Sequence, residues 1–583
     1  MDSKNADSGR IDHHNQPSSL ELGRNNLADW EAAQPSNFFT ADLGFQRSLE
    51  YRWGLEKYRK YAAQLYKFGE VVARKVNSAV IVANRSENLP RLERFDAWGN
   101  RREEIYFHPS HHEAGKHIYG SGIMGAYTEP GANLLALAIF YLSSQNGEAG
   151  HNCPLACTAG LIRVLMAVGS KQLQKTYLPR LFDPEYDTHF HGAQFLTEVQ
   201  GGSDVGANAA AATPTDRDGE WLLNGEKWFC SNITADLSLV TARVHGQGDG
   251  TKGLGLFMMP RFLGNGQPNS VYIQRLKDKL GTRSLATGEI EFKNAVAYQV
   301  GATENGFKNV MNHVINTSRI YNAMAVCGNA RRAYVTASTY AQHRRAFDRA
   351  IVHYPIVQDI LANMRADVSA ILSGSLHIIN LQDQVDLGKA EQATVEFLRF
   401  AINLNKYRSA IYAHQTIVSA IEVLGGNGAI ETFSVLPRLL RDNIVYENWE
   451  GTHNVLLSQL QRDIRRYRID RPFMAITREL LEELSQESLR SEGLGLLDRI
   501  VAELDEVTAM DELTAGIYFR PLMDRLADLY YATCLLGEAD WEVSEKRDGT
   551  KLRLATLFFN RRAAKREPKD IAYYDDLVSR LCI

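Results

Sequence analysis

Apolar residues recur at helix-like intervals through the first third of the chain. This period places them on one face of a helix, so residues 49–181 are predicted to be mainly helical. Residues 1–45 are polar and are predicted to be mobile. Residues 85–107 interrupt the helical pattern and contain a turn signal at 96–100. The clearest apolar repeat consists of Leu49, Trp53, Tyr58, Tyr61, Ala62, Leu65 and Tyr66.

The middle of the chain changes to short, strand-like apolar runs. The dipeptide Asn224-Gly225 stands between two such runs and predicts a hairpin, because both residue types tolerate positive backbone angles. We therefore expect an antiparallel β domain over residues 191–305. Its other predicted strands are 237–244, 254–259, 271–276 and 288–292.

Helical patterns resume at Gly306 and continue to the end of the chain. Long amphipathic stretches with few helix breakers predict a C-terminal four-helix bundle over residues 306–470. A further segment, 471–583, is predicted to be a helical extension. The predicted helices are 307–343, 355–383, 389–424 and 450–467, with others around 480–484 and 494–504.

The pattern as a whole predicts an α+β fold that is mainly α. The predicted order is a polar segment (1–45), an N-terminal helical domain (46–190), the β domain, the helical bundle and the extension. A chain of 583 residues is long enough for several hydrophobic cores. With 44% hydrophobic and 23% charged residues, its composition is that of a folded protein.

Charge and hydropathy narrow the functional classes. The net charge of −4 gives no general attraction to nucleic acid. The longest apolar run, near 134–142, is too short to span a bilayer, so we expect no membrane insertion. The first residues are polar and acidic and contain no signal-like apolar stretch, so a cytoplasmic location is expected.

Cysteine and histidine residues do not form a metal-site pattern. Cys153 and Cys157 lie near His151, but no second ligand pair stands at a suitable spacing. A buried helical face explains these three residues better. Surface or structural roles also explain a histidine-rich stretch, so no metal is predicted; the stretch contains His108, His111, His112 and His117.

A glycine-containing turn is the first candidate for ligand binding. In residues 195–204 a strand runs into paired glycines, which expose backbone N–H groups, and Thr197 and Ser203 add hydroxyls. Taken alone, this is an ordinary loop between strands.

Three ordered motifs change that interpretation. They occur in order along a helix–β–helix chain, at residues 197–204, 227–232 and 450–454. In this order they resemble the motifs of the acyl-CoA dehydrogenase family. The resemblance covers about residues 45–465 and includes segments 169–179, 344–347, 424–428 and 440–442. Within the family, the chain most resembles the AidB-type adaptive-response subgroup; the segments that carry this likeness are 94–100, 107–109, 148–154, 200–204 and 276–281.

The resemblance implies FAD as the cofactor and assigns positions that contact it. Phe229 would pack on the flavin ring and Ser231 would hydrogen-bond to it. Arg344 would reach the FAD bound by a neighbouring subunit and hold its pyrophosphate. The resemblance therefore implies a homo-oligomer, and a tetramer built from dimers is expected. The cofactor positions are Leu196, Thr197, Gly202, Ser203, Phe229, Ser231, Arg344, Phe347, Gly425, Gly426, Thr452 and Asn454.

The resemblance also locates the catalytic base. Family members carry a glutamate either before a Gly-Thr pair or beside an arginine on an earlier helix. Ser318 stands at the earlier position, so Glu450 is the candidate. Arg319 and Ser203 match substrate-binding positions. The implied reaction is oxidation of a fatty acyl-CoA to its trans-2-enoyl-CoA, by α-proton abstraction and β-hydride transfer to flavin.

Two other functions remain open, because fold likeness does not decide activity. One is a DNA-associated alkylation-response flavoprotein, and the other is an acyl-CoA or fatty-acyl sequestering protein. Residues 471–583 contain 16 Lys and Arg but 22 Asp and Glu, so tight DNA binding is not expected. One basic patch could still bind DNA, and it comprises Lys546, Arg547, Lys551, Arg553, Arg561, Arg562, Lys565, Arg566 and Lys569. The acyl chain length and the electron acceptor are not determined by the sequence.

Overall fold

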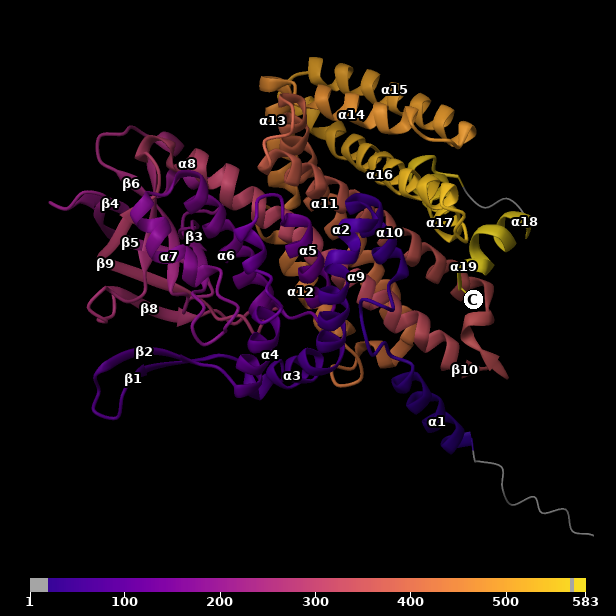
Figure 1. Cartoon of the computed structure of the whole chain (residues 1–583), viewed down its shortest axis with the longest axis horizontal. Helices are drawn as coiled ribbons and strands as arrows, with labels where there is room; N and C mark the ends of the chain where they lie inside the picture. The colour runs from indigo at the N-terminus through magenta and orange to yellow at the C-terminus, as the bar shows by residue number, and fades with distance from the viewer. Residues whose placement is uncertain (1–18, 567–570, 583) are drawn as a thin grey trace, which may run out of the picture.

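The structure is a computed structural model that describes residues 19–566 and 571–582. Helices, a central sheet and further helices follow one another along the chain (Figure 1), so the predicted α+β, mainly helical fold class is confirmed. The first part contains α1 (Ser19–Ala32), α2 (Leu43–Val71), α3 (Asn77–Ala83), β1 (Arg91–Phe95), β2 (Arg101–Tyr106), α4 (Pro109–Tyr119), α5 (Asn133–Ser144), α6 (Ala149–Val168) and α7 (Lys171–Leu181).

Two expectations for this part need correction. The segment predicted to be mobile contains helix α1, and Phe38 and Phe39 after it are buried, because their rings join the main hydrophobic core. Residues 1–18 lie outside the described residues. The irregular stretch before Phe107 is a hairpin of β1 and β2, whose turn is the predicted one: Asp96 N donates to Asn100 O at 2.9 Å.

Helices α5 and α6 form the centre of this part. Every residue of α5 is buried, and α5 packs against α9 and α10 of the C-terminal part. Helix α6 is long and apolar enough to cross a membrane by length and composition, but 72% of its apolar window is buried within the protein. Burial of this extent is typical of the core helix of a folded domain.

The central sheet contains β3 (Gly192–Phe195), β4 (Ala211–Pro214), β5 (Glu220–Ser231), β6 (Leu237–Val244), β7 (Leu254–Pro260), β8 (Val271–Leu276) and β9 (Thr287–Gln299). Its strand order is β3-β6-β4-β5-β9-β7, with β8 paired to β9. Most pairings are antiparallel, as predicted. The exceptions are β3–β6 and β4–β6, which are parallel, so the sheet is mixed.

The hairpin predicted at Asn224-Gly225 is wrong. Both residues lie inside β5, which continues past them along β9 with a register shift between Leu223 and Asn224. The Asn224 side chain donates to Asn294 Oδ1 at 2.9 Å, and Gly225 adopts a φ of 134°. The pairing skips Asn294 of β9, which has a φ of 55° and is the bulged residue opposite this dipeptide.

The C-terminal part contains α8 (Gly306–Asn309), α9 (Asn316–His343), the short strands β10 (Arg345–Ala346) and β11 (Arg349–Ala350), α10 (Pro355–Asp386), α11 (Gln392–Leu424), α12 (Leu436–Asn448) and α13 (His453–Tyr467). Its long helices agree with the predicted ones except at residue 450. Glu450 was predicted to begin a helix, but it lies outside α12 and α13, and Thr452 caps α13 by accepting from Val455 N.

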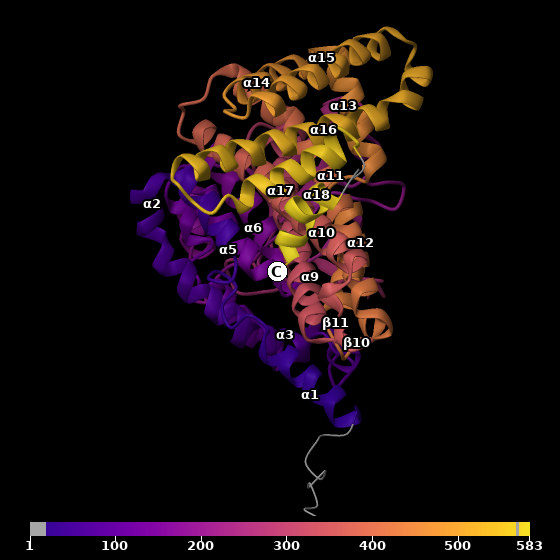
Figure 2. The same ribbon diagram turned by 90° about the vertical axis from the view of Figure 1, so that its right-hand side faces the viewer.

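The extension contains α14 (Asp470–Glu482), α15 (Glu487–Ala509), α16 (Glu512–Ser544), α17 (Thr550–Phe558), α18 (Ile571–Tyr574) and α19 (Arg580–Cys582). These helices cover one side of the molecule (Figures 1 and 2), where α16 and α17 pack on α10.

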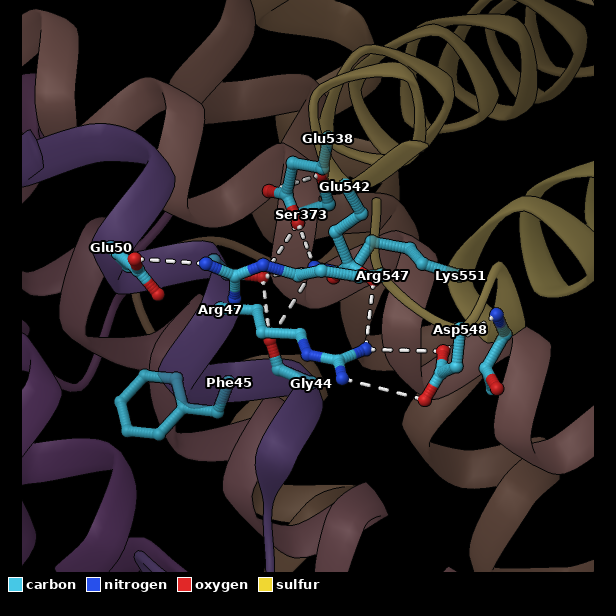
Figure 3. A network of polar contacts seen from close by, with 12 residues as sticks. Gly44, Phe45, Arg47, Glu50, Ser373, Glu538, Glu542, Arg547, Asp548 and Lys551 are labelled. Atoms are coloured by element: carbon cyan, nitrogen blue, oxygen red, sulfur yellow. Dashed lines mark hydrogen bonds and ion pairs between the residues drawn. The ribbon is translucent and has the colours of Figure 1, made fainter. Parts of the chain in front are cut away.

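A buried ionic network joins the extension to the N-terminal part (Figure 3). Glu538 of α16 accepts from Arg52 of α2 at 2.7 Å and from Lys551 of α17 at 2.8 Å. Burial alone would raise the pKa of Glu538, but Lys551 and Arg52 lower it to about 2. At its edge, Arg47 pairs with Glu542 at 3.0 Å. A buried charge is tolerated only when it is paired. These ion pairs therefore fix α16 and α17 against α2 of the N-terminal part.

The predicted basic patch is largely used within the chain. Carboxylates pair with five of its members: Arg547 with Glu50, Lys551 with Glu538, Arg561 with Asp359, Arg562 with Asp367, and Arg566 with Glu492. Lys569 lies outside the described residues. The patch is therefore mostly an intramolecular contact rather than an open cationic face.

Candidate active site

Glu450 lies where the β sheet meets the helical bundle. It occupies the link between α12 and α13 with a φ of 57°, a left-handed conformation uncommon for a non-glycine residue. The residue keeps some exposed surface, and it is one of the residues that line a small cavity between α6, α9 and the α12–α13 link. Gln194 Nε2, at the end of β3, donates to Glu450 Oε1 at 2.7 Å.

Opposing influences act on the Glu450 carboxylate. Burial raises the pKa of Glu450, whereas the charges of Arg319 and Lys406 and the hydrogen bond from Gln194 oppose that rise. The net shift is upward, so the carboxylate is a stronger base than an exposed glutamate.

Two buried cations support the backbone of the Glu450 link. Arg319 Nε donates to Glu450 O at 2.9 Å. Lys406 of α11 donates to Glu447 O at 2.8 Å and to Gly451 O at 2.7 Å. Burial lowers the pKa of Arg319 to about 10 and, with Arg319 nearby, the pKa of Lys406 to about 7. These contacts stabilise the strained conformation that directs the Glu450 side chain inward.

The two residues predicted to bind substrate, Arg319 and Ser203, lie in different environments. Arg319 is buried, and its guanidinium also donates to Asn403 and Gln459. These contacts give Arg319 a supporting role beside Glu450, and its expected contact with substrate stays a prediction. Ser203 is exposed on the glycine turn. Ser318 Oγ lies 3.2 Å from Gln194 Nε2, so the earlier helix presents a hydroxyl to the residue that contacts Glu450.

A second group of predicted residues lies where the chain leaves β3 and runs beside β5. Trp228 N of β5 donates to Thr197 O at 2.9 Å, which places Thr197 next to Phe229, and Phe229 is 51% exposed although it is a large aromatic residue. Ser231 Oγ lies 3.1 Å from Thr287 Oγ1. At Gly202 an added Cβ would lie 2.8 Å from Thr197 Oγ1, so only glycine keeps this turn against Thr197. Leu196 O accepts from Asn208 and from Lys227, which fixes the start of the turn.

A third group lies at the other end of the molecule. Arg344 ends α9 just before β10, which is remote from the sheet in Figure 1. Phe347 is 91% exposed. Asn427 Nδ2 donates to Tyr340 OH at 3.2 Å, so the loop of Gly425 and Gly426 lies beside the same end of α9. One chain therefore does not bring this group together with Glu450.

The segment after Glu450 contacts the extension. Arg520 of α16 donates to Asn454 Oδ1 at 2.6 Å and to Tyr407 OH at 3.2 Å. Asn454 was expected to contact FAD, and that contact stays a prediction; in this chain its side-chain oxygen accepts from Arg520. The extension thus supports the helix that follows Glu450.

Comparison with known proteins identifies the family. Residues 30–188 match the "Adaptive response protein AidB N-terminal domain", residues 193–295 the "Acyl-CoA dehydrogenase, middle domain", and residues 304–464 the "Acyl-CoA dehydrogenase, C-terminal domain". "Acyl-CoA dehydrogenase family member 11" of Caenorhabditis elegans is 31% identical over 436 residues, which is 72% of this chain and 69% of that protein. This chain belongs to the acyl-CoA dehydrogenase family.

Other relatives of this acyl-CoA dehydrogenase family member agree with that assignment. "Putative acyl-CoA dehydrogenase AidB" of Escherichia coli is 31% identical over 388 residues, covering 64% of this chain and 69% of that protein. The apo form of Bd2924 superposes with a TM-score of 0.80 at 28% identity, covering 87% and 98% of the two chains. C. elegans ACDH-11, solved with C11-CoA, has a TM-score of 0.84 at 24% identity, covering 92% and 93%, which shows the shared fold.

FAD is the cofactor of this family, and the residues present are compatible with it. The exposed Phe229 ring offers an apolar surface for a flavin, and Ser231 beside it offers a hydroxyl. The glycine turn leaves backbone groups accessible next to Thr197. These features lie on the strands adjoining Gln194, which contacts Glu450.

Sequence reasoning missed Gln194 and Lys406. Neither belongs to the motifs that carry the family resemblance, and only the fold brings them to Glu450. Lys406 stands in α11 among other polar residues, such as Asn403, Asn405 and Arg408, so the sequence pattern did not single it out.

A histidine cluster near the site has a packing explanation. His111, Glu148 and His151 offer potential metal ligands within 4.8 Å of one another. The two imidazole rings stack with centroids 4.1 Å apart and planes 23° apart. Because ring-nitrogen lone pairs lie in the ring planes, stacked rings do not direct them at one ion. Asn84 and Ser284 donate to the Glu148 carboxylate.

Proposed function

We propose that this chain is an FAD-dependent acyl-CoA dehydrogenase in which Glu450 removes the α-proton of a fatty acyl-CoA. The observation that carries the proposal is the Glu450 carboxylate, which is hydrogen-bonded to Gln194, is made more basic by burial and belongs to a residue that lines a small cavity. A general base works best when its pKa approaches the working pH. Bound FAD would supply the acceptor for the hydride that leaves the β-carbon.

The residues around Glu450 have separate tasks in this proposal. Gln194 orients one carboxylate oxygen, so the other remains available for the proton. Arg319 and Lys406 hold the backbone on both sides of Glu450. Four aromatic residues line the cavity and limit the water that could solvate the carboxylate and weaken it as a base: Phe140, Tyr321, Tyr446 and Trp449. The product is the trans-2-enoyl thioester, with the α-proton on Glu450.

The remote group of Arg344, Phe347, Gly425 and Gly426 is proposed to complete the FAD site of a partner chain. Phe347 is almost fully exposed, and an Arg fork suits a pyrophosphate. These residues lie far from Phe229 and Ser231 of their own chain, so the proposed FAD site needs a second copy of the chain. We expect a homo-oligomer, namely a tetramer built from dimers. A cytoplasmic location is likewise proposed.

The alternative functions have less support. For DNA association, the candidate patch has most of its charges paired within the chain, and paired charges release few counterions on binding. For sequestration, the same cavity would bind a thioester without reaction. The ACDH-11 structure with C11-CoA supports an acyl-CoA as ligand in either case.

The decisive experiment is anaerobic reduction of the bound flavin by acyl-CoA. We expect bleaching with the parent protein and its loss, by at least about a thousandfold in rate, in Glu450→Gln, which keeps the shape but cannot accept a proton. The variant should remain yellow and bind acyl-CoA. Parent-like bleaching in Glu450→Gln would place the base elsewhere. A parent that binds acyl-CoA but never bleaches would favour sequestration.

A further inference from the structure

Lys279 is a largely buried cation in the link between β8 and β9. Its ammonium group donates to Leu285 O at 2.7 Å and to Thr287 Oγ1 at 2.9 Å. Burial lowers the pKa of Lys279 to about 8, so the side chain is mostly charged at pH 7. Because an ammonium group only donates hydrogen bonds, the Thr287 hydroxyl must accept from Lys279.

Thr287 connects this cation to Ser231. The two residues are partners across β5 and β9, and their hydroxyl oxygens lie 3.1 Å apart. Thr287 is 4% exposed, and within the described part of the chain its hydroxyl contacts only Lys279 and Ser231. A buried hydroxyl hydrogen without an acceptor is costly, and the ammonium group cannot accept it. Thr287 therefore donates to Ser231 Oγ.

The direction of this bond decides what the Ser231 hydroxyl can do. Its oxygen accepts from Thr287, and no other hydrogen bond of its side chain is found among the described residues. Its own hydrogen is therefore available to a ligand. Phe229 lies on the same face of β5, because side chains alternate along a strand and Cys230 between the two is buried. Ser231 thus presents a donor beside the exposed ring that is expected to pack on the flavin.

We propose that Lys279 is a positioning residue of the flavin site: through Thr287 it holds the Ser231 hydroxyl as a hydrogen-bond donor to FAD. Without Lys279, the Thr287 hydroxyl would be free to accept from Ser231, whose hydrogen would then point away from the ligand. A donor aimed at the flavin stabilises the negative charge that the ring gains on reduction. The inference rests on the FAD site of the proposed function, but not on Glu450 as the base.

The test measures the two-electron reduction potential of the full-length, FAD-loaded protein at pH 7 without acyl-CoA. Lys279→Met keeps the side-chain length and removes the donor, whereas Ser231→Ala removes the end of the hydrogen-bond chain. We expect each variant to make the flavin harder to reduce, by roughly tenfold in the reduction equilibrium or about 30 mV. In the double variant, the loss caused by Lys279→Met should disappear, because the chain is already broken at Ser231.

Three further variants separate this chain from other effects of Lys279. Thr287→Val keeps the shape of the side chain and should reproduce the loss, whereas Thr287→Ser keeps the hydroxyl and should retain the parental potential. Lys277→Met is the matched control. The Lys277 ammonium lies 4.8 Å from the centre of the Phe229 ring, but it pairs with Glu289. Its effect on the potential should be the same with and without Ser231→Ala.

An equal effect of Lys279→Met in the presence and absence of the Ser231 hydroxyl would overturn the inference, because Lys279 would then act only by its charge or on the fold of its link. An unchanged potential in Lys279→Met or in Thr287→Val would overturn it too. If Lys279→Met does not fold, Thr287→Val carries the same double-variant comparison. If a variant releases its flavin, the comparison is made on the FAD affinity of the apo-protein, with the same loss of additivity expected. Flavin bleaching by acyl-CoA shows separately whether the proposed function survives.

Discussion

Replacing Gln194 with leucine tests how the fold sets the strength of the base. Gln194 Nε2 makes the hydrogen bond to Glu450 Oε1 at 2.7 Å, and its other contact is with Ser318. Leucine has a similar size and cannot donate. The variant should therefore retain the packing at the end of β3 and lose one interaction with the ionised carboxylate.

The magnitude follows from the kind of bond that is lost. A hydrogen bond to a charged group contributes about 1.5–3 kcal/mol, which is roughly a ten- to hundredfold change in the proton-binding equilibrium. Because this bond favours the ionised form, its loss raises the pKa of Glu450 further. Anaerobic bleaching should then slow by roughly that factor on the acidic side of the pH profile, while the alkaline plateau is retained.

The assay is stopped-flow bleaching of the flavin across the pH range, with Ser318→Ala as the matched control. Ser318 contacts Gln194 but has no hydrogen bond to Glu450, so its profile should shift little. A uniform rate loss at every pH in Gln194→Leu would indicate disturbed packing rather than altered basicity. An unchanged profile would refute the role assigned to Gln194.

Two further predictions concern stability and assembly. Glu538→Gln should lower the free energy of unfolding by about 3–5 kcal/mol, because the charges of Lys551 and Arg52 stay buried but lose the carboxylate that pairs with both of them. Glu50→Gln, which disturbs only the partly exposed pair with Arg547, should cost no more than about 1 kcal/mol. The pKa of Glu538 is held below that of a free glutamate, at about 2; its contribution is therefore complete above the unfolded-state pKa and is lost as the pH falls toward 2. Thermal melts of both variants from neutral to acidic pH should show the Glu538 deficit narrowing, and a constant deficit would contradict the pairing. Arg344→Ala should be purified with less than about half the parental FAD content and with a smaller oligomer by light scattering; a monomeric variant with full FAD occupancy would disprove the shared site.

The long helices could be predicted because their periodic pattern of apolar residues depends only on which face of each helix is buried. The helices of the C-terminal part follow from such patterns, since one face of each packs against a neighbour. The errors lie where local chemistry permits two outcomes. Asn224-Gly225 suits a tight turn, but pairing with β9 keeps both residues within β5, opposite a bulge at Asn294. Helix α1 is polar, and its formation in the folded chain was not visible in the apolar pattern.

Glu450, which we propose as the base, could be located from its motif, but its environment could not. Gln194 lies on β3, Arg319 on α9 and Lys406 on α11, so three elements distant in sequence determine the basicity and conformation of one carboxylate. Each contact depends on tertiary packing, so it could not be predicted from the spacing of residues along the chain. Arg319 illustrates the consequence: its position resembles a substrate contact, yet its guanidinium is committed to Glu450 O, Asn403 and Gln459. A motif can thus identify the group that reacts, whereas the residues that tune it must be found in the structure. For the same reason, substitutions at Gln194 should change the pH dependence of the reaction without changing any residue of the recognised motifs.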